Sequence, residues 1–122
     1  MAKRKAATCT LRWRKCTVYF EKNGGAGRME MLYDGSTRVF LADDMSKCNV
    51  QDTLLHELFE AVAADMGFRF ENKDRRAKSN QDLLFHMTHS EFTEACSFVG
   101  PAFAACLPQV MAAWKKLKTR VK

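Results

Sequence analysis

The sequence predicts an α+β protein in which a small antiparallel sheet of about three strands comes first and about three helices follow. Two observations support this order: apolar residues alternate with polar ones before residue 43, and they recur with helical spacing after residue 51. At 122 residues the chain is long enough for one hydrophobic core and short for two. Residues 1–122 are therefore expected to form a single domain.

Strand-like segments occupy the first part of the chain. Alternating apolar and polar side chains predict strands at residues 16–21, 28–33 and 38–42. The glycine-rich stretch 23–27 lacks the Lys-Ser/Thr of a phosphate-binding loop and favours a turn. Gly35 allows the positive φ that a tight turn between the last two strands requires. The three strands are expected to pair in one antiparallel sheet.

Helical spacing begins at Asp52. One stripe of the expected helix contains Leu55, Leu58, Val62 and Met66. Asp52 or Asn49 is the expected N-cap, because a short oxygen-bearing side chain satisfies the first free backbone N–H groups. Gly67 is the expected end of this helix.

Two further helices are expected in the C-terminal part. The first begins at Thr88 or Ser90 and stops before Gly100-Pro101, because proline lacks the N–H of a helix interior and suits the first turn of a new helix. The second follows directly and contains Pro108, which is expected to kink it.

The net charge of +6 arises entirely from the two ends of the chain. Residues 1–16 carry six Lys or Arg and residues 115–122 carry five, with no acid in either segment, so residues 17–114 hold nine basic and fourteen acidic side chains, a net of 9 − 14 = −5. The ends, residues 1–15 and 115–122, are predicted to be flexible and solvated. Basic ends give at most weak, salt-dependent contact with nucleic acid or an acidic partner.

The cysteines indicate a reducing compartment. The chain has five, Cys9, Cys16, Cys48, Cys96 and Cys106, an odd number with no C-x-x-C pair. This pattern favours reduced thiols over a disulfide framework or a zinc ribbon. No apolar segment follows the basic N-terminus, and no run of eighteen apolar residues occurs, so neither a signal peptide nor a membrane span is expected. We expect a cytoplasmic protein without membrane contact.

One helical turn carries the residues that point to chemistry. His56 and Glu60 are four residues apart, so both side chains lie on one face of the expected helix, and Glu57 projects about 100° further round. Imidazole nitrogen and carboxylate oxygen both ligate zinc at roughly 2.0–2.2 Å, and catalytic zinc sites use three protein ligands and a water. A carboxylate ligand also suits another divalent ion, such as manganese.

Residues 53–62 (TLLHELFEAV) resemble the active-site helix of zincin-type metallopeptidases, and more closely the short His-Glu-x-x-His/Glu proteins of bacteriophages and prophages. Glu60 stands where that family usually has a second histidine, and residues 34–43 precede the helix as a zincin edge strand would. The resemblance implies a minimal zincin-like fold and a zinc-dependent hydrolase of peptide or protein substrates. Glu57 would then be the general base that takes a proton from a metal-bound water, whose pKa the ion lowers to about 7.

A third protein ligand must come from another part of the chain, where His86 and His89 are the other two histidines. His89 is the expected ligand because it follows Thr88 at the start of the next helix, and the resembling phage proteins have a histidine in a similar place. His86 is the second choice. Each is also consistent with an exposed or helix-capping imidazole.

Other interpretations of these residues stay open. An H-E-x-x-E match also arises on the surface of an ordinary amphipathic helix, where His56 and Glu60 would form only an i, i+4 pair. Cys48 precedes the helix and could act as a nucleophile with His56, although the spacing does not require it. A zincin-like protein without turnover could bind nucleic acid or a host protein through its basic ends. An accessory factor or inhibitor could use the polar segment 69–82.

Overall fold

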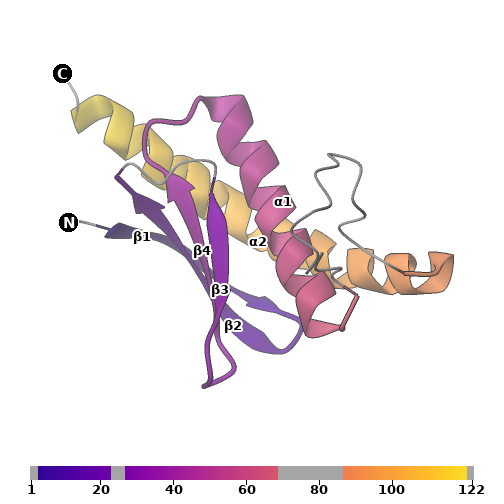
Figure 1. Ribbon diagram of the computed structural model, residues 1–122. Helices are drawn as coiled ribbons and strands as arrows, with labels where there is room; N and C mark the ends of the chain where they lie inside the picture. Colours follow the sequence, from indigo (N-terminus) through magenta and orange to yellow (C-terminus); the bar gives the residue numbers. More distant parts are fainter. Residues whose placement is uncertain (1–2, 23–26, 69–86, 121–122) are drawn as a thin grey trace, which may run out of the picture.

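The computed structural model describes residues 3–22, 27–68 and 87–120, which form four strands and two helices (Figure 1). In chain order these are β1 (Lys3–Leu11), β2 (Arg14–Glu21), β3 (Arg28–Met31), β4 (Thr37–Ala42), α1 (Lys47–Asp65) and α2 (His89–Arg120). The α+β class is confirmed, with one more strand and one fewer helix than predicted. The predicted loop 69–82 and His86 lie outside the described residues.

The sheet is mixed, whereas the sequence predicted an antiparallel one. Its strand order is β1-β2-β4-β3, and β2 pairs with β4 in parallel while the two outer pairings are antiparallel. The chain passes through β3 before it enters β4, and β4 then pairs between β2 and β3. As a result β4, within residues 34–43, is an inner strand, and the edge strand before α1 is β3.

The basic N-terminal segment forms a strand, whereas the sequence predicted a flexible end. β1 pairs with β2 along its length, from Lys3 opposite Glu21 to Leu11 opposite Arg14. Ala7 and Leu11 on β1 are buried, at 3% and 2% exposure. These two residues supply the apolar face of the strand, and the three charged residues at its start obscured the alternation in the sequence.

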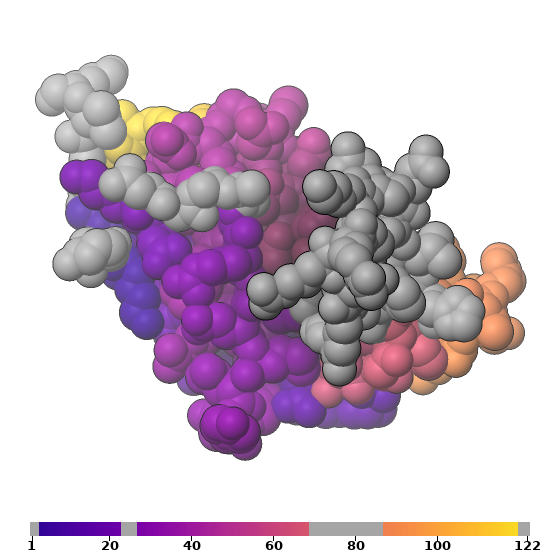
Figure 2. Space-filling view, in the orientation of Figure 1, coloured from indigo at the N-terminus to yellow at the C-terminus, as the bar shows by residue number. Residues whose placement is uncertain are grey.

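Both helices cover the same face of the sheet. A single core cluster joins alternate residues of the inner strands, including Val18 and Phe20 on β2 and Val39 and Leu41 on β4, with the buried sides of α1 and α2. Alternate residues of a strand point to one face, so the two helices share that face. In the view of Figure 2, β3, β4 and α1 form much of the coloured surface and α2 shows mainly at the margins.

Helix α1 begins five residues earlier than predicted. Its N-cap is Ser46, whose hydroxyl accepts a hydrogen bond from the backbone N–H of Asn49 at 3.3 Å. Gly67 ends the helix as predicted, with φ of +83°. The buried stripe contains Leu54, Leu58, Ala61 and Val62, whereas the predicted member Leu55 is 45% exposed.

Helix α2 is continuous over 32 residues, whereas the sequence predicted two helices broken at Gly100-Pro101. Pro101 and Pro108 are seven residues apart and both exposed, so they lie on the solvent side of the helix. There water can bond the carbonyl groups that lose an N–H partner, which lowers the cost of each proline. Buried Val99, Cys106 and Val110 hold the opposite side in the core.

Helix α2 also has the length and composition of a membrane span. A stretch of 18 residues within His89–Thr119 has a mean hydropathy of 1.4, and 28% of that stretch is buried. The central helix of a folded domain can share these properties, and α2 contributes to the core beneath the sheet.

Candidate metal site

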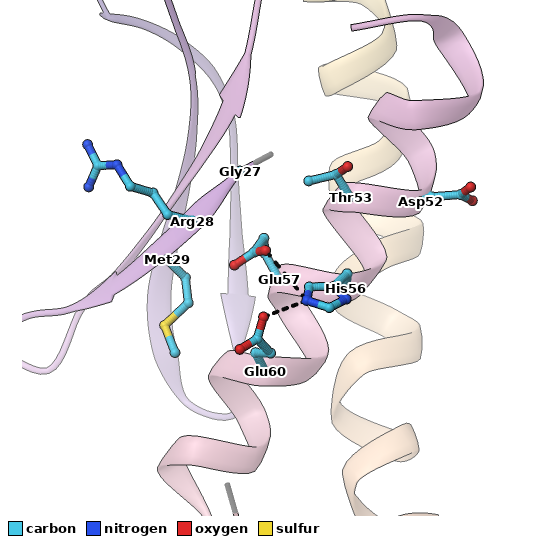
Figure 3. A pocket seen from close by; sticks show the side chains of 8 residues that line it. All are labelled: Gly27, Arg28, Met29, Asp52, Thr53, His56, Glu57 and Glu60. Atoms are coloured by element: carbon cyan, nitrogen blue, oxygen red, sulfur yellow. Dashed lines mark ion pairs between the residues drawn. The ribbon is translucent and has the colours of Figure 1, made fainter. Parts of the chain in front are cut away.

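The predicted site residues lie on α1, beside a pocket that opens against the start of β3 (Figure 3). The pocket has a volume of about 520 Å³. Its lining residues are Gly27, Arg28, Met29, Asp52, Thr53, His56, Glu57 and Glu60. In Figure 3 the side chains of His56, Glu57 and Glu60 converge, whereas Arg28 and Asp52 point away from them. The side of the pocket formed by α1 therefore carries the imidazole and the two carboxylates close together.

The three converging side chains form a compact set of donor atoms. The Nε2 atom of His56 lies 2.6 Å from Oε2 of Glu60 and 3.8 Å from Oε2 of Glu57. One ligand atom from each of the three residues falls within 4.8 Å of the other two. This convergence follows from helix geometry for His56 and Glu60, which lie one turn apart.

The two carboxylates are buried and the imidazole is not. Glu57 and Glu60 are 5% and 8% exposed, whereas the side chain of His56 is 57% exposed. Buried carboxylates favour a nearby positive charge, which a cation or a protonated imidazole supplies. The set thus combines two buried carboxylates with one exposed imidazole at the mouth of the pocket.

Gly27 brings β3 close to this helix. It has φ of +98°, and a Cβ atom built on it would stand 2.5 Å from Cγ2 of Thr53 and 3.8 Å from Oε2 of Glu57. The sequence predicts a turn at Gly27 but does not predict its contact with Thr53. A glycine directly before a short strand is compatible with such a close approach, but the sequence does not identify the helix residue it faces.

The other predicted residues lie apart from the cluster. His89 is the first residue of α2 and is exposed, and it is not among the described donors that come together within 4.8 Å. Cys48 is exposed in the first turn of α1, eight residues before His56, and is likewise not a member. Within the described residues the cluster consists of His56, Glu57 and Glu60.

The donor set fits a divalent ion after a small adjustment. Ligand atoms at about 2.05 Å from a tetrahedral zinc ion are about 3.3 Å apart. The His56–Glu60 separation of 2.6 Å is that of a direct hydrogen bond, so the imidazole must move by several tenths of an ångström. Two ionised carboxylates and a neutral imidazole would together carry a charge of −2, the complement of a divalent cation.

Comparison with known proteins adds no relative, because no family model, no curated protein and no solved structure matches the chain.

Proposed function

We propose that this chain is a divalent-metal-dependent hydrolase resembling a minimal zincin peptidase of the phage type, and that zinc is its metal. The observation that supports the proposal is the convergence of His56, Glu57 and Glu60 on one wall of a pocket that is large enough to admit part of a substrate. The i, i+4 spacing places His56 and Glu60 on one face of the helix, and Glu57 is three residues before Glu60 and lies beside them.

Each residue has a proposed role. His56 and Glu60 hold the ion, and His89 is the proposed third ligand, which would have to reach the pocket from the start of α2. A bound ion would lower the pKa of a coordinated water and polarise a carbonyl group. Glu57, whose carboxylate lies 3.8 Å from the imidazole nitrogen of His56, would then accept the proton of that water.

The edge strand supports a peptide as substrate. β3 is at the end of the sheet order, and its residues Arg28 and Met29, together with Gly27 directly before the strand, lie along the pocket. An edge strand offers backbone N–H and C=O groups to an extended peptide. A peptide that adds to β3 would pass in front of His56 and the two glutamates.

Metal titration is the decisive test. Zinc is titrated into metal-free protein by isothermal calorimetry, and one ion should bind per chain. His56→Ala should abolish binding, whereas Asp52→Asn, which changes an exposed carboxylate one turn earlier in the same pocket, should retain it. Folded wild-type protein that shows no affinity for zinc or manganese would overturn the proposal.

A second candidate function, binding of nucleic acid without turnover, is favoured by a different observation. Basic residues from the N-terminal and the C-terminal parts of the chain come together in space and line one groove of about 310 Å³. Arg4 and Lys5 on β1 and Lys116 on α2 surround it, with Phe20 and Leu117 also in its wall. Cations that converge on one groove can contact successive phosphates of a nucleic acid backbone.

Substitution tests this candidate better than truncation, because removal of residues 1–15 would delete β1 and with it one edge of the sheet. Arg4→Glu with Lys116→Glu should weaken binding to a duplex oligonucleotide and reduce its salt dependence. Lys15→Glu with Lys47→Glu makes the same charge change outside the groove. Equal affinity of both double variants for the oligonucleotide would show that the groove is not the binding site for nucleic acid.

A further inference from the structure

Three of the five cysteines meet where β1 and β2 pack against α2. Cys9 on β1 lies directly opposite Cys16 on β2 in the strand register, so both side chains point to one face. Cys16 and Cys106 are fully buried in the core cluster, and Cys9 packs against that cluster while it remains partly exposed. The exposed thiols, Cys48 and Cys96, are not part of this group.

Two hydrogen bonds between Gln109 on α2 and Thr8 on β1 hold these elements together near the thiols. The side-chain amide of Gln109 donates to the carbonyl of Thr8 at 3.2 Å, and its oxygen accepts from the N–H of Thr8 at 3.3 Å. Gln109 is one helical turn after Cys106, and Thr8 precedes Cys9. The two bonds therefore fix the turn of α2 that carries Cys106 against the part of β1 that carries Cys9.

Cys9 is the most acidic thiol of the three. Hydrogen bonds from Cys106 and, to a lesser degree, from Cys16 lower its pKa to about 4, although burial opposes them. The same hydrogen bonds and burial raise the pKa of the two donor thiols. Cys9 is also the member of the group that is partly exposed, whereas Cys16 and Cys106 are buried, so Cys9 is the thiol that a small oxidant reaches first.

The hairpin geometry selects the partner of Cys9. β1 and β2 are joined by a two-residue turn, Arg12-Trp13, so the flanking pair Leu11 and Arg14 is expected to be hydrogen-bonded. Opposed residues of an antiparallel pair of strands alternate between hydrogen-bonded and non-hydrogen-bonded pairs. Cys9 and Cys16 are two positions along from Leu11 and Arg14, so they also form a hydrogen-bonded pair. In such pairs the Cβ atoms stand about 5.5 Å apart, wider than the roughly 3.5–4.5 Å of a disulfide. Cys106 on α2 has no such restriction.

We propose that Cys9 is a peroxide-reactive thiol and that Cys106 resolves its oxidised form into a disulfide joining β1 to α2. The thiolate of Cys9 attacks hydrogen peroxide, the O–O bond breaks, and Cys9 becomes a sulfenic acid while hydroxide leaves. The thiol of Cys106 then attacks the sulfenic sulfur, the new S–S bond forms, and water leaves with the thiol proton. In total two thiols are oxidised, and one peroxide is reduced to two molecules of water.

The same thiols are poorly arranged for a soft metal ion. Three thiolates around one ion would bring all three sulfurs within mutual reach, but the described residues contain no such cysteine set within 4.8 Å.

Peptide mapping by mass spectrometry tests the proposal on the full-length protein. After mild treatment with hydrogen peroxide, a Cys9–Cys106 disulfide should form and should disappear on reduction. Cys9 and Cys106 should be lost together in this treatment, ahead of the exposed Cys48 and Cys96.

Three variants separate the roles. Cys106→Ser should leave Cys9 as a sulfenic acid that a dimedone probe traps, Cys16→Ser should still form the Cys9–Cys106 bond, and Cys48→Ser should change nothing. Mapping of the wild type alone decides the question if a core variant fails to fold. A Cys9–Cys16 disulfide, or oxidation of Cys48 and Cys96 ahead of Cys9, would overturn the proposal.

Discussion

Gly27 lies directly against Thr53: a Cβ atom on this glycine would stand 2.5 Å from the Cγ2 atom of the threonine. The contact joins the residue before β3 to the helix α1, one turn before Glu57. Since Gly27 and Thr53 both line the pocket, their separation sets the distance between the strand and the cluster of His56, Glu57 and Glu60.

The variant Gly27→Ala should therefore disturb both stability and the pocket. The added methyl group must displace Thr53, and alanine also resists the φ of +98°. Gly67→Ala is the matched control, because that glycine has φ of +83° but no atom within 4 Å of an added Cβ. Thermal denaturation should show a larger loss for Gly27→Ala than the about 1–2 kcal/mol expected from left-handed backbone alone.

A companion variant isolates the steric part of this effect. Thr53→Ser removes Cγ2, so Gly27→Ala combined with Thr53→Ser should recover the excess loss of stability and of zinc affinity. Additive effects in this double-mutant cycle would mean that the two residues do not interact as the structure indicates.

The two buried glutamates should respond differently to amide substitution. Glu60→Gln removes a charged ligand and should weaken zinc binding at least about ten-fold. Glu57→Gln should keep the metal but lose hydrolysis of a peptide substrate, because an amide cannot accept the proton of water. Loss of the metal in Glu57→Gln would make Glu57 a ligand in place of the exposed His89.

The helix that carries the candidate site was predictable because its pattern is local. Four-residue spacing places His56 and Glu60 together in any α-helix, and Gly67 ends the helix through its own backbone preference. Gly27 is different, since its partner Thr53 is 26 positions later and no local rule connects the two.

Two predictions, the helix break at Pro101 and the flexible N-terminal end, were wrong because packing in the fold outweighs local sequence preferences. Pro101 predicted a break, but both prolines of α2 face solvent and the buried side of the helix continues past them. The charges at the start of β1 predicted a solvated end, but pairing with β2 and burial of Ala7 and Leu11 stabilise a strand there. Both outcomes depend on burial against other elements of the fold, which the local sequence pattern does not show.

Asp65 should stabilise the β1–β2 turn through its charge. Its carboxylate bonds Arg12 at 2.7 Å and Arg14 at 2.7 Å, and its side chain is only 10% exposed. The two arginines flank or belong to a turn in which Arg12 and Trp13 both have positive φ, at 48° and 66°. Asp65→Asn should therefore lower the free energy of unfolding by about 1–3 kcal/mol at neutral pH. The exposed Asp44→Asn is the control of equal charge change.

The pH dependence of this loss follows from the pKa of Asp65. Burial acts to raise that pKa, but the hydrogen bonds from Arg14 and Arg12 outweigh it and the pKa is lowered. A lowered folded-state pKa stabilises the protein above the unfolded value, about 4, and this stabilisation is lost as the pH falls through the lower folded value. Urea denaturation at pH 7 should separate the wild type from Asp65→Asn, and the difference should shrink below about pH 4. A difference that stays constant down to pH 2 would show that geometry, and not the charge of Asp65, holds the turn.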